Sequence, residues 1–235
     1  MAAEPERATP TAVLPWSEFM ARFDWKQGEH VSLIGPTGGG KTTLALGLLP
    51  HRQFVCVLAT KPADPTLSLL RALGYKRVES WPPPGPPALN PRVLLWPRFR
   101  GRRDMPAQRA AIANALVEMF GVGGWTIYVD ELAYLSQMLR LDTDLRLIWQ
   151  QGRALKLTLI GATQRPAWVP LEMYSQATHL FFWRTGDKAD LGRIGGIGGI
   201  DPTLIRARVA RLRNHECLYV NTRNGDSFVT KADRS

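Results

Sequence analysis

The residues best suited to chemistry lie in a glycine-rich string, GPTGGGKT, at positions 35–42. The string fits the pattern G-x-x-x-x-G-K-[ST], in which glycines let backbone N–H groups point inward at a phosphate. An apolar run precedes it and an apolar helical pattern follows, so the positive end of a helix would also face the anion. We expect the phosphates of a nucleotide to be bound by Gly35, Pro36, Thr37, Gly38, Gly39, Gly40, Lys41, Thr42 and Thr43.

A second string, TIYVDE at 126–131, is an apolar run that ends in two carboxylates. With a phosphate loop present, Asp130 is expected to bind the shell of a Mg²⁺ ion that the hydroxyl of Thr42 also holds. Glu131 is expected to polarise the attacking water as general base, and Lys41 to reach the β- and γ-phosphates. Alone, each string is also compatible with a solvated turn or strand end; together they predict nucleotide hydrolysis.

A third polar stretch, GATQRP at 161–166, follows the apolar run 155–160. If this strand is the neighbour of the Asp-Glu strand, its end lies beside the γ-phosphate. Gln164 is then a neutral side chain that can hold the attacking water or sense the γ-phosphate, with Thr163 assisting. The alternative is a polar strand end that touches no ligand.

Positioning these residues requires a mostly parallel sheet. Continuous apolar strands that alternate with helical patterns are typical of a parallel sheet covered on both faces. Two final apolar runs joined through RNGD predict an antiparallel hairpin at the C-terminus. Strands are expected at 30–35, 53–60, 92–97, 125–131, 157–163 and 178–184, and helices at 15–25, 65–75, 106–121, 132–151 and 202–213. The stretch 38–50 is expected to be a loop that opens a further helix, which Pro50 ends.

The order of these strings indicates an α/β fold of the phosphate-loop NTPase class, in its RecA-like ATPase branch. In chain order, two strands separate the phosphate loop from the Asp-Glu strand, and a glutamate follows the aspartate. This order favours ATP over GTP, and no N-K-x-D string is present to recognise guanine.

The length and composition are those of one domain. The 235 residues allow one sizeable α/β domain, expected at 15–235 after a disordered tail at 1–14. No apolar run approaches the roughly 18 residues of a membrane span. Cys56 and Cys217 lie far apart in apolar runs, which predicts two buried, reduced thiols. The net charge of +10 favours a polyanionic partner.

The strings GPTGGGKTT, TIYVDE and QQGRALKLTLIGATQRP, with their spacing, resemble the FtsK–HerA superfamily of DNA-pumping ATPases over residues 28–185. LATKP at 58–62 resembles an Asp-x-Lys segment of that family, but Ala59-Thr60 stands where its aspartate is expected, so only Lys61 carries over. The resemblance implies rings, usually hexamers, with each ATP site at a subunit boundary.

The same resemblance implies an arginine that reaches from one subunit to the γ-phosphate of its neighbour. Arg153, in the Gly-Arg element that precedes the strand 157–163, is the first choice. Arg146, Arg165 and Arg140 are the alternatives. Any of the four can also be a solvated arginine on a helix surface.

The lack of membrane helices, a winged-helix tail or an N-terminal barrel makes the chain look more like the genome-packaging ATPases of tailless, membrane-containing (tectivirus-like) viruses. We therefore expect an ATP-driven translocase of double-stranded DNA that packages a viral genome. It would work with a capsid or membrane vertex protein, in the host cytoplasm or at the packaging vertex of the virion.

Three other functions stay open. The first is DNA transfer in plasmids or chromosomes, and the second is an adaptor module that binds ATP without pumping DNA. The third is a small-molecule kinase. Glu131 and Gln164 argue against the kinase, because a kinase must keep water from attacking.

Two basic segments are candidates for contact with DNA. In the first, 96–104, arginines surround Phe99, a combination suited to a phosphate backbone; they are Arg98, Arg100, Arg102 and Arg103. The second is the helix at 202–213, whose arginines form either a DNA-binding stripe or a solvated face. Between them, the glycine-rich 192–201 is expected to be a hinge or mobile loop.

Overall fold

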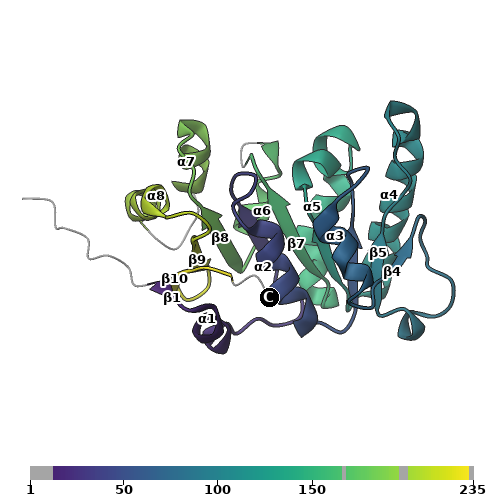
Figure 1. Ribbon diagram of the computed structural model, residues 1–235, viewed down its shortest axis with the longest axis horizontal. Helices are drawn as coiled ribbons and strands as arrows, with labels where there is room; N and C mark the ends of the chain where they lie inside the picture. Colours follow the sequence, from purple (N-terminus) through teal and green to yellow (C-terminus); the bar gives the residue numbers. More distant parts are fainter. Residues whose placement is uncertain (1–12, 166–167, 196–200, 233–235) are drawn as a thin grey trace, which may run out of the picture.

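The computed structural model describes residues 13–165, 168–195 and 201–232 (Figure 1). Most of the predicted N-terminal tail and half of the glycine-rich segment 192–201 lie outside these ranges, as does Pro166 of GATQRP. Val13–Leu14, assigned above to the tail, form a short strand. No helix of the described residues is both long enough and apolar enough to cross a membrane.

Within the described residues, ten strands form a single sheet in the order β1-β10-β9-β8-β2-β7-β6-β3-β5-β4. From β8 to β4 all neighbours are parallel, whereas β9 is antiparallel to both β8 and β10. The predicted α/β fold, mostly parallel sheet and C-terminal hairpin are therefore confirmed. The strands are β1 Val13–Leu14, β2 Val31–Ile34, β3 Val55–Leu58, β4 Lys76–Val78, β5 Arg92–Leu95, β6 Thr126–Val129, β7 Thr158–Thr163, β8 His179–Trp183, β9 Cys217–Asn221 and β10 Ser227–Thr230.

Helices cover both faces of this sheet, and each face has its own apolar core. One core contains Phe19, Leu44 and Leu67 of α1, α2 and α3; the other contains Leu116 of α4 and Trp149 of α5. The helices are α1 Trp16–Arg22, α2 Lys41–Leu48, α3 Pro65–Ser68, α4 Met105–Val122, α5 Asp142–Gln151, α6 Glu172–Ser175, α7 Lys188–Gly195 and α8 Pro202–Arg211. Short helical turns lie at η1 Leu49–His51, η2 Leu69–Arg71, η3 Pro87–Leu89, η4 Arg102–Asp104, η5 Tyr134–Met138 and η6 Gly152–Leu155.

Two of the predicted helices differ in the structure. The helix expected at 132–151 is broken, because Arg140 takes a positive φ of 54° between the π-helical turn η5 and α5. The helix expected at 65–75 ends early and its chain turns into the edge strand β4. Strand β9 pairs with β8, so the terminal hairpin extends the main sheet. As predicted, Cys56 and Cys217 are free and buried.

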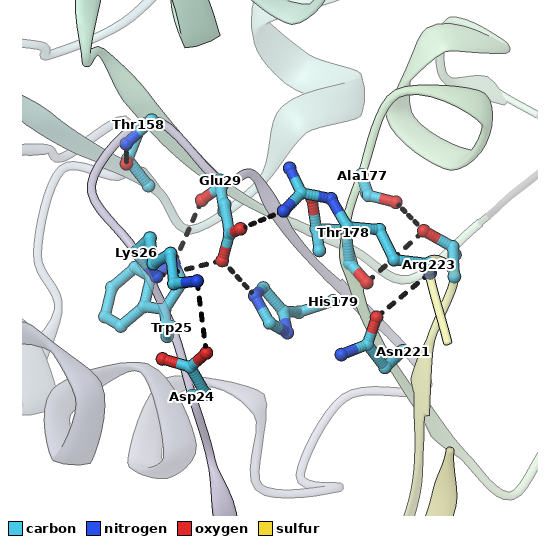
Figure 2. Close-up of polar contacts among 12 residues, drawn as sticks. Asp24, Trp25, Lys26, Glu29, Thr158, Ala177, Thr178, His179, Asn221 and Arg223 are labelled. Carbon is cyan, nitrogen blue, oxygen red and sulfur yellow. Dashed lines mark hydrogen bonds and ion pairs between the residues drawn. The ribbon is translucent and has the colours of Figure 1, made fainter. Parts of the chain in front are cut away.

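A buried carboxylate fixes the start of the phosphate-loop strand (Figure 2). Glu29, just before β2, accepts hydrogen bonds from Arg223 Nη1 at 2.5 Å and from the Lys26 N–H at 2.9 Å, and lies 3.0 Å from His179 Nε2. Burial raises the pKa of Glu29, but the hydrogen bonds and the charges of His179 and Arg223 together hold it below its ordinary value. The cluster joins the loop before β2 to β8 and to the β9–β10 hairpin.

Candidate nucleotide-binding site

The order of the central strands brings three polar strand ends to one edge of the sheet. Strand β7 pairs with β2 on one side and with β6 on the other, with Thr163 opposite Ile34 and Gly161 opposite Val129. The predicted adjacency of the GATQRP strand and the Asp-Glu strand is therefore confirmed. The strands β3 and β5, which separate the two motifs in sequence, lie on the far side of β6.

The phosphate loop follows β2 and leads into α2, which begins at Lys41. Gly38 and Gly40 take positive φ values of 75° and 114°, a conformation that favours glycine. A Cβ at Gly35 would lie 2.5 Å from the Cβ of Trp183 on β8, so no side chain fits there. Trp183 is buried beneath the loop. Its indole would also lie within 3.5 Å of a Cβ atom placed at Gly39 or Gly40.

Lys41 folds back over the loop that it follows. Its Nζ donates to the carbonyls of Gly35 at 2.6 Å and Pro36 at 2.9 Å. Burial lowers the pKa of Lys41 to about 8, although the nearby carboxylates of Glu131 and Asp130 act in the opposite direction. The side chain is therefore within reach of any phosphate held by the loop, and it has carbonyl partners that a phosphate can replace.

Asp130 is buried at the end of β6 and is surrounded by donors. Its Oδ1 accepts from Thr42 Oγ1 at 2.9 Å and from the Tyr128 hydroxyl at 2.8 Å, and its Oδ2 accepts from Lys61 Nζ at 2.7 Å. Burial raises the pKa of Asp130, but these partners together hold it below its ordinary value. The structure thus places an ionised carboxylate beside the Thr42 hydroxyl.

Glu131 and Gln164 lie close together at the same edge. Burial raises the pKa of the Glu131 carboxyl, against the charge of Lys41 and a hydrogen bond with Gln164. Gln164 is exposed, and its Oε1 accepts from the Thr37 hydroxyl of the phosphate loop at 2.7 Å. Thr163 is buried and its hydroxyl accepts from the Arg165 N–H at 3.2 Å, so it shapes the strand end.

The four arginines proposed as a trans-acting residue differ in their surroundings. Arg153 is exposed in η6, which precedes β7, whereas Gln164 follows β7. Because a strand of this length spans about 20 Å, Arg153 lies far from the nucleotide site of its own chain. Arg146 is paired with Asp142 and Glu172. The remaining two are Arg140, exposed at its positive φ, and Arg165, which lies near Asp187 and Asp190.

The two arginine-rich segments lie toward opposite ends of the molecule (Figure 1). The first follows β5, at the carboxyl ends of the parallel strands, where the phosphate loop also lies. All four of its arginines are exposed; they are Arg98, Arg100, Arg102 and Arg103. Phe99 contacts the ring of Tyr134, three residues after Glu131, with ring centroids 6.5 Å apart. The second is α8, where Arg208 donates to the Ser227 hydroxyl.

The site contains residues that the sequence reasoning missed. Tyr128 points to the same side of β6 as Asp130, and their spacing of two residues along a strand was the available signal. Trp183 carried no local signal, because it approaches the phosphate loop from a strand nearly 150 residues later in the chain. The partner of Lys61 was equally hidden, since only the fold brings it to Asp130.

The residues present fit a nucleotide and a magnesium ion. The glycine loop offers a backbone cradle that a Cβ at Gly35 would destroy, and it opens a helix. The hydroxyl of Thr42 and the carboxylate of Asp130 are oxygen ligands of the kind Mg²⁺ prefers, and they already lie in contact. Thr42 and Asp130 would hold the metal, and the loop with Lys41 would hold the phosphates.

Comparisons with known proteins agree with this geometry. The chain is 20% identical over 176 residues to the DNA packaging ATPase P9 of Enterobacteria phage PRD1, covering 74% of this chain and 71% of that protein. No protein-family model matches the chain.

Solved structures of packaging and related ATPases have the same fold. One is B204, the DNA-packaging ATPase of Sulfolobus turreted icosahedral virus, with a TM-score of 0.65 at 17% identity over 89% of this chain and 100% of that one. The packaging NTPase B204 of Sulfolobus turreted icosahedral virus 2, in complex with AMPPCP, gives 0.64 at 16% identity over 88% and 100%.

VirB4 of Thermoanaerobacter pseudethanolicus gives a TM-score of 0.66 at 12% identity, over 88% of this chain and 89% of that one. These matches confirm the predicted resemblance to packaging ATPases of the FtsK–HerA type, and they bear out the prediction of an ATPase.

Proposed function

We propose that this protein is the motor that packages a viral genome, hydrolysing ATP to move double-stranded DNA into a capsid. The observation that carries the proposal is the contact between Thr37 and Gln164, with Glu131 beside them. In this proposal Gln164 is the group that positions water, between the phosphate loop and Glu131 as the carboxylate base. Similarity to the packaging ATPase of phage PRD1 supports packaging as the purpose of that hydrolysis.

In the proposed reaction the chain positions ATP and an attacking water. The loop N–H groups and Lys41 bind the phosphates, while Thr42 and Asp130 hold Mg²⁺, which when bound neutralises charge on the phosphate oxygens. Glu131 accepts the proton of the water, and Gln164 orients that water toward the γ-phosphorus. A base beside an exposed amide supports hydrolysis over kinase chemistry, which must exclude water.

The site of one chain is completed in this proposal by a neighbour in a ring, a hexamer by analogy with the family. Arg153 remains the first choice for the arginine that reaches the γ-phosphate, because it is exposed and lies at the opposite end of β7 from its own site. Arg146 is less suited, because leaving Asp142 and Glu172 would break two ion pairs. The partners would be double-stranded DNA and a capsid or membrane vertex protein, at the packaging vertex of the virion.

The test is the rate of ATP hydrolysis with double-stranded DNA, with single-stranded DNA and with neither, at several salt concentrations. We expect double-stranded DNA to stimulate hydrolysis, and Lys41→Ala to abolish both the basal and the stimulated rate. Hydrolysis that no nucleic acid alters would contradict the motor and favour the adaptor module. Stimulation by single-stranded DNA alone would favour a role in DNA transfer, as for a conjugation ATPase.

A further inference from the structure

Lys61 occupies one side of the carboxylate that would hold the metal. Its Nζ lies 2.7 Å from Asp130 Oδ2, whereas Oδ1 is taken by the hydroxyls of Thr42 and Tyr128. Asp130 is only 7% exposed, and a buried carboxylate needs a compensating charge. Among the described residues, Lys61 is the one cation within ion-pair distance of Asp130. It therefore supplies that charge in the metal-free protein.

The backbone of Lys61 is held in place, while its side chain can move. The Lys61 carbonyl accepts from the indole N–H of Trp96 at 2.8 Å, and the preceding Thr60 carbonyl accepts from the buried amide of Gln108 at 3.0 Å. The Lys61 side chain is 48% exposed. Its ammonium group can thus change partner by rotation about side-chain bonds, without any shift of the chain.

A second acceptor is already prepared for that ammonium group. Asp64 Oδ2 lies 3.3 Å from Lys61 Nζ. The other oxygen, Oδ1, caps α3 by accepting from the N–H groups of Thr66 and Leu67 at 3.0 and 3.1 Å. The cap fixes the Asp64 carboxylate and leaves Oδ2 directed at Lys61. Lys61 therefore stands between a carboxylate at the metal position and a carboxylate anchored outside it.

We propose that Lys61 is a positioning residue that competes with the divalent cation for Asp130 and withdraws to Asp64 when metal and nucleotide enter together. The inference rests on the ATP site of the proposed function. Without phosphates, a cation gains too few ligands to displace Lys61, so the empty site keeps an ordered, charge-balanced Asp130. With phosphates present, their oxygens add ligands, and Lys61 then gives up Asp130.

The test is a titration of the full chain with Mn²⁺, a spectroscopic stand-in for Mg²⁺, monitored by electron paramagnetic resonance without nucleotide and with ADP. Without nucleotide, we expect Lys61→Met to bind Mn²⁺ about tenfold more tightly than the wild type, since no charged hydrogen bond must be broken. Lys61→Arg, which keeps the charge, should stay close to the wild type. Wild-type or weaker affinity in Lys61→Met would overturn the proposal.

Asp64→Asn gives an independent readout should Lys61→Met fail to fold. Asparagine can still cap α3 but offers no charge to Lys61. With ADP present, we therefore expect this variant to bind Mn²⁺ more weakly than the wild type does. Unchanged affinity would also overturn the proposal. Asp130→Asn with ADP tests the site itself: if it binds Mn²⁺ as the wild type does, the metal site of the proposed function is wrong, and the role of Lys61 falls with it.

Discussion

The hydroxyl of Thr37 donates a 2.7 Å hydrogen bond to the side-chain carbonyl of Gln164. The bond joins the loop after β2 to the residue that follows the neighbouring strand β7. The phosphate loop is thereby tied to the group proposed to orient water. Replacing Gln164 by Ala should lower the turnover number for ATP about a hundredfold, the usual loss when one preorganised polar group at a reacting centre is removed. Nucleotide affinity, measured with a fluorescent ADP, should change little. The matched control is Thr37→Val, which removes only the hydrogen bond to Gln164, and its turnover number should fall much less. Equal losses of turnover in the two variants would assign Gln164 a structural role.

Glu131 is the proposed base, and the isosteric Glu131→Gln should separate binding from hydrolysis. We expect the rate of hydrolysis to fall by about 10²–10⁴, because the glutamine cannot accept the proton of the water. Bound ATP should then persist on the protein, which a filter-binding assay with labelled ATP would detect. Rapid turnover in this variant would transfer the role of base to another residue.

The pKa of Lys41, lowered to about 8 by burial, predicts how ATP affinity changes with pH. In the free protein Lys41 loses its proton as the pH rises through about 8, whereas bound phosphates favour the protonated form. Binding above that pH therefore takes up a proton, and affinity should weaken as pH increases, approaching tenfold per unit. Lys41→Arg keeps its charge throughout this range and should give a flat profile. An affinity independent of pH between 7.5 and 9.5 in the wild type would contradict this assignment.

The basic loop after β5 should carry the electrostatic contact with DNA. Removing Arg102 and Arg103 together, as Arg102→Gln/Arg103→Gln, should weaken binding and lower the slope of log affinity against log salt by about 0.9 for each lost phosphate contact. The matched control is Arg206→Gln/Arg211→Gln on α8, which removes the same charge from exposed positions. If the slope changes only in the control, α8 is the DNA-binding surface.

The buried carboxylate of Glu29 should make the free energy of unfolding depend on pH in the acid range. Its pKa in the folded protein lies below the unfolded value of about 4.3, so its stabilising effect is complete above that pH and is lost as pH falls through the folded value. At pH 7, Glu29→Gln should lower the free energy of unfolding by about 1.5–3 kcal/mol, as expected for hydrogen bonds to a charged group. Urea titrations at pH 7 and pH 3.5 would measure the difference, which should shrink at the lower pH. A difference of the same size at both pH values would contradict the role of the charge.

Motifs with a local mechanism were readable from the sequence alone. The phosphate loop, the Asp130-Glu131 strand end and the terminal hairpin each depend on residues that are close in the chain. The adjacency of β7 and β6 followed from the polar exit at Gln164, because carboxyl ends of parallel strands meet at one edge.

Contacts between distant segments were not readable in this way. Trp183 beneath the phosphate loop and Lys61 on Asp130 depend on how β8 and the turn after β3 are placed by the whole sheet. The break at Arg140 was also hidden, because an apolar helical pattern continues through it and only the positive φ interrupts it. Strand β4 is too short and too polar to be distinguished from a loop.

The outer strands of the described sheet are both very short. At one edge, β1 has two residues; at the other, β4 has three, with the exposed charges of Lys76 and Arg77. Long, uncharged edges invite other chains to add strands and aggregate, whereas both of these edges are short and the β4 edge is also charged. A filament or ring built by extending the backbone ladder is therefore disfavoured. Copies of this chain would have to assemble through side-chain surfaces, which can slide and separate during a mechanical cycle without unzipping a sheet.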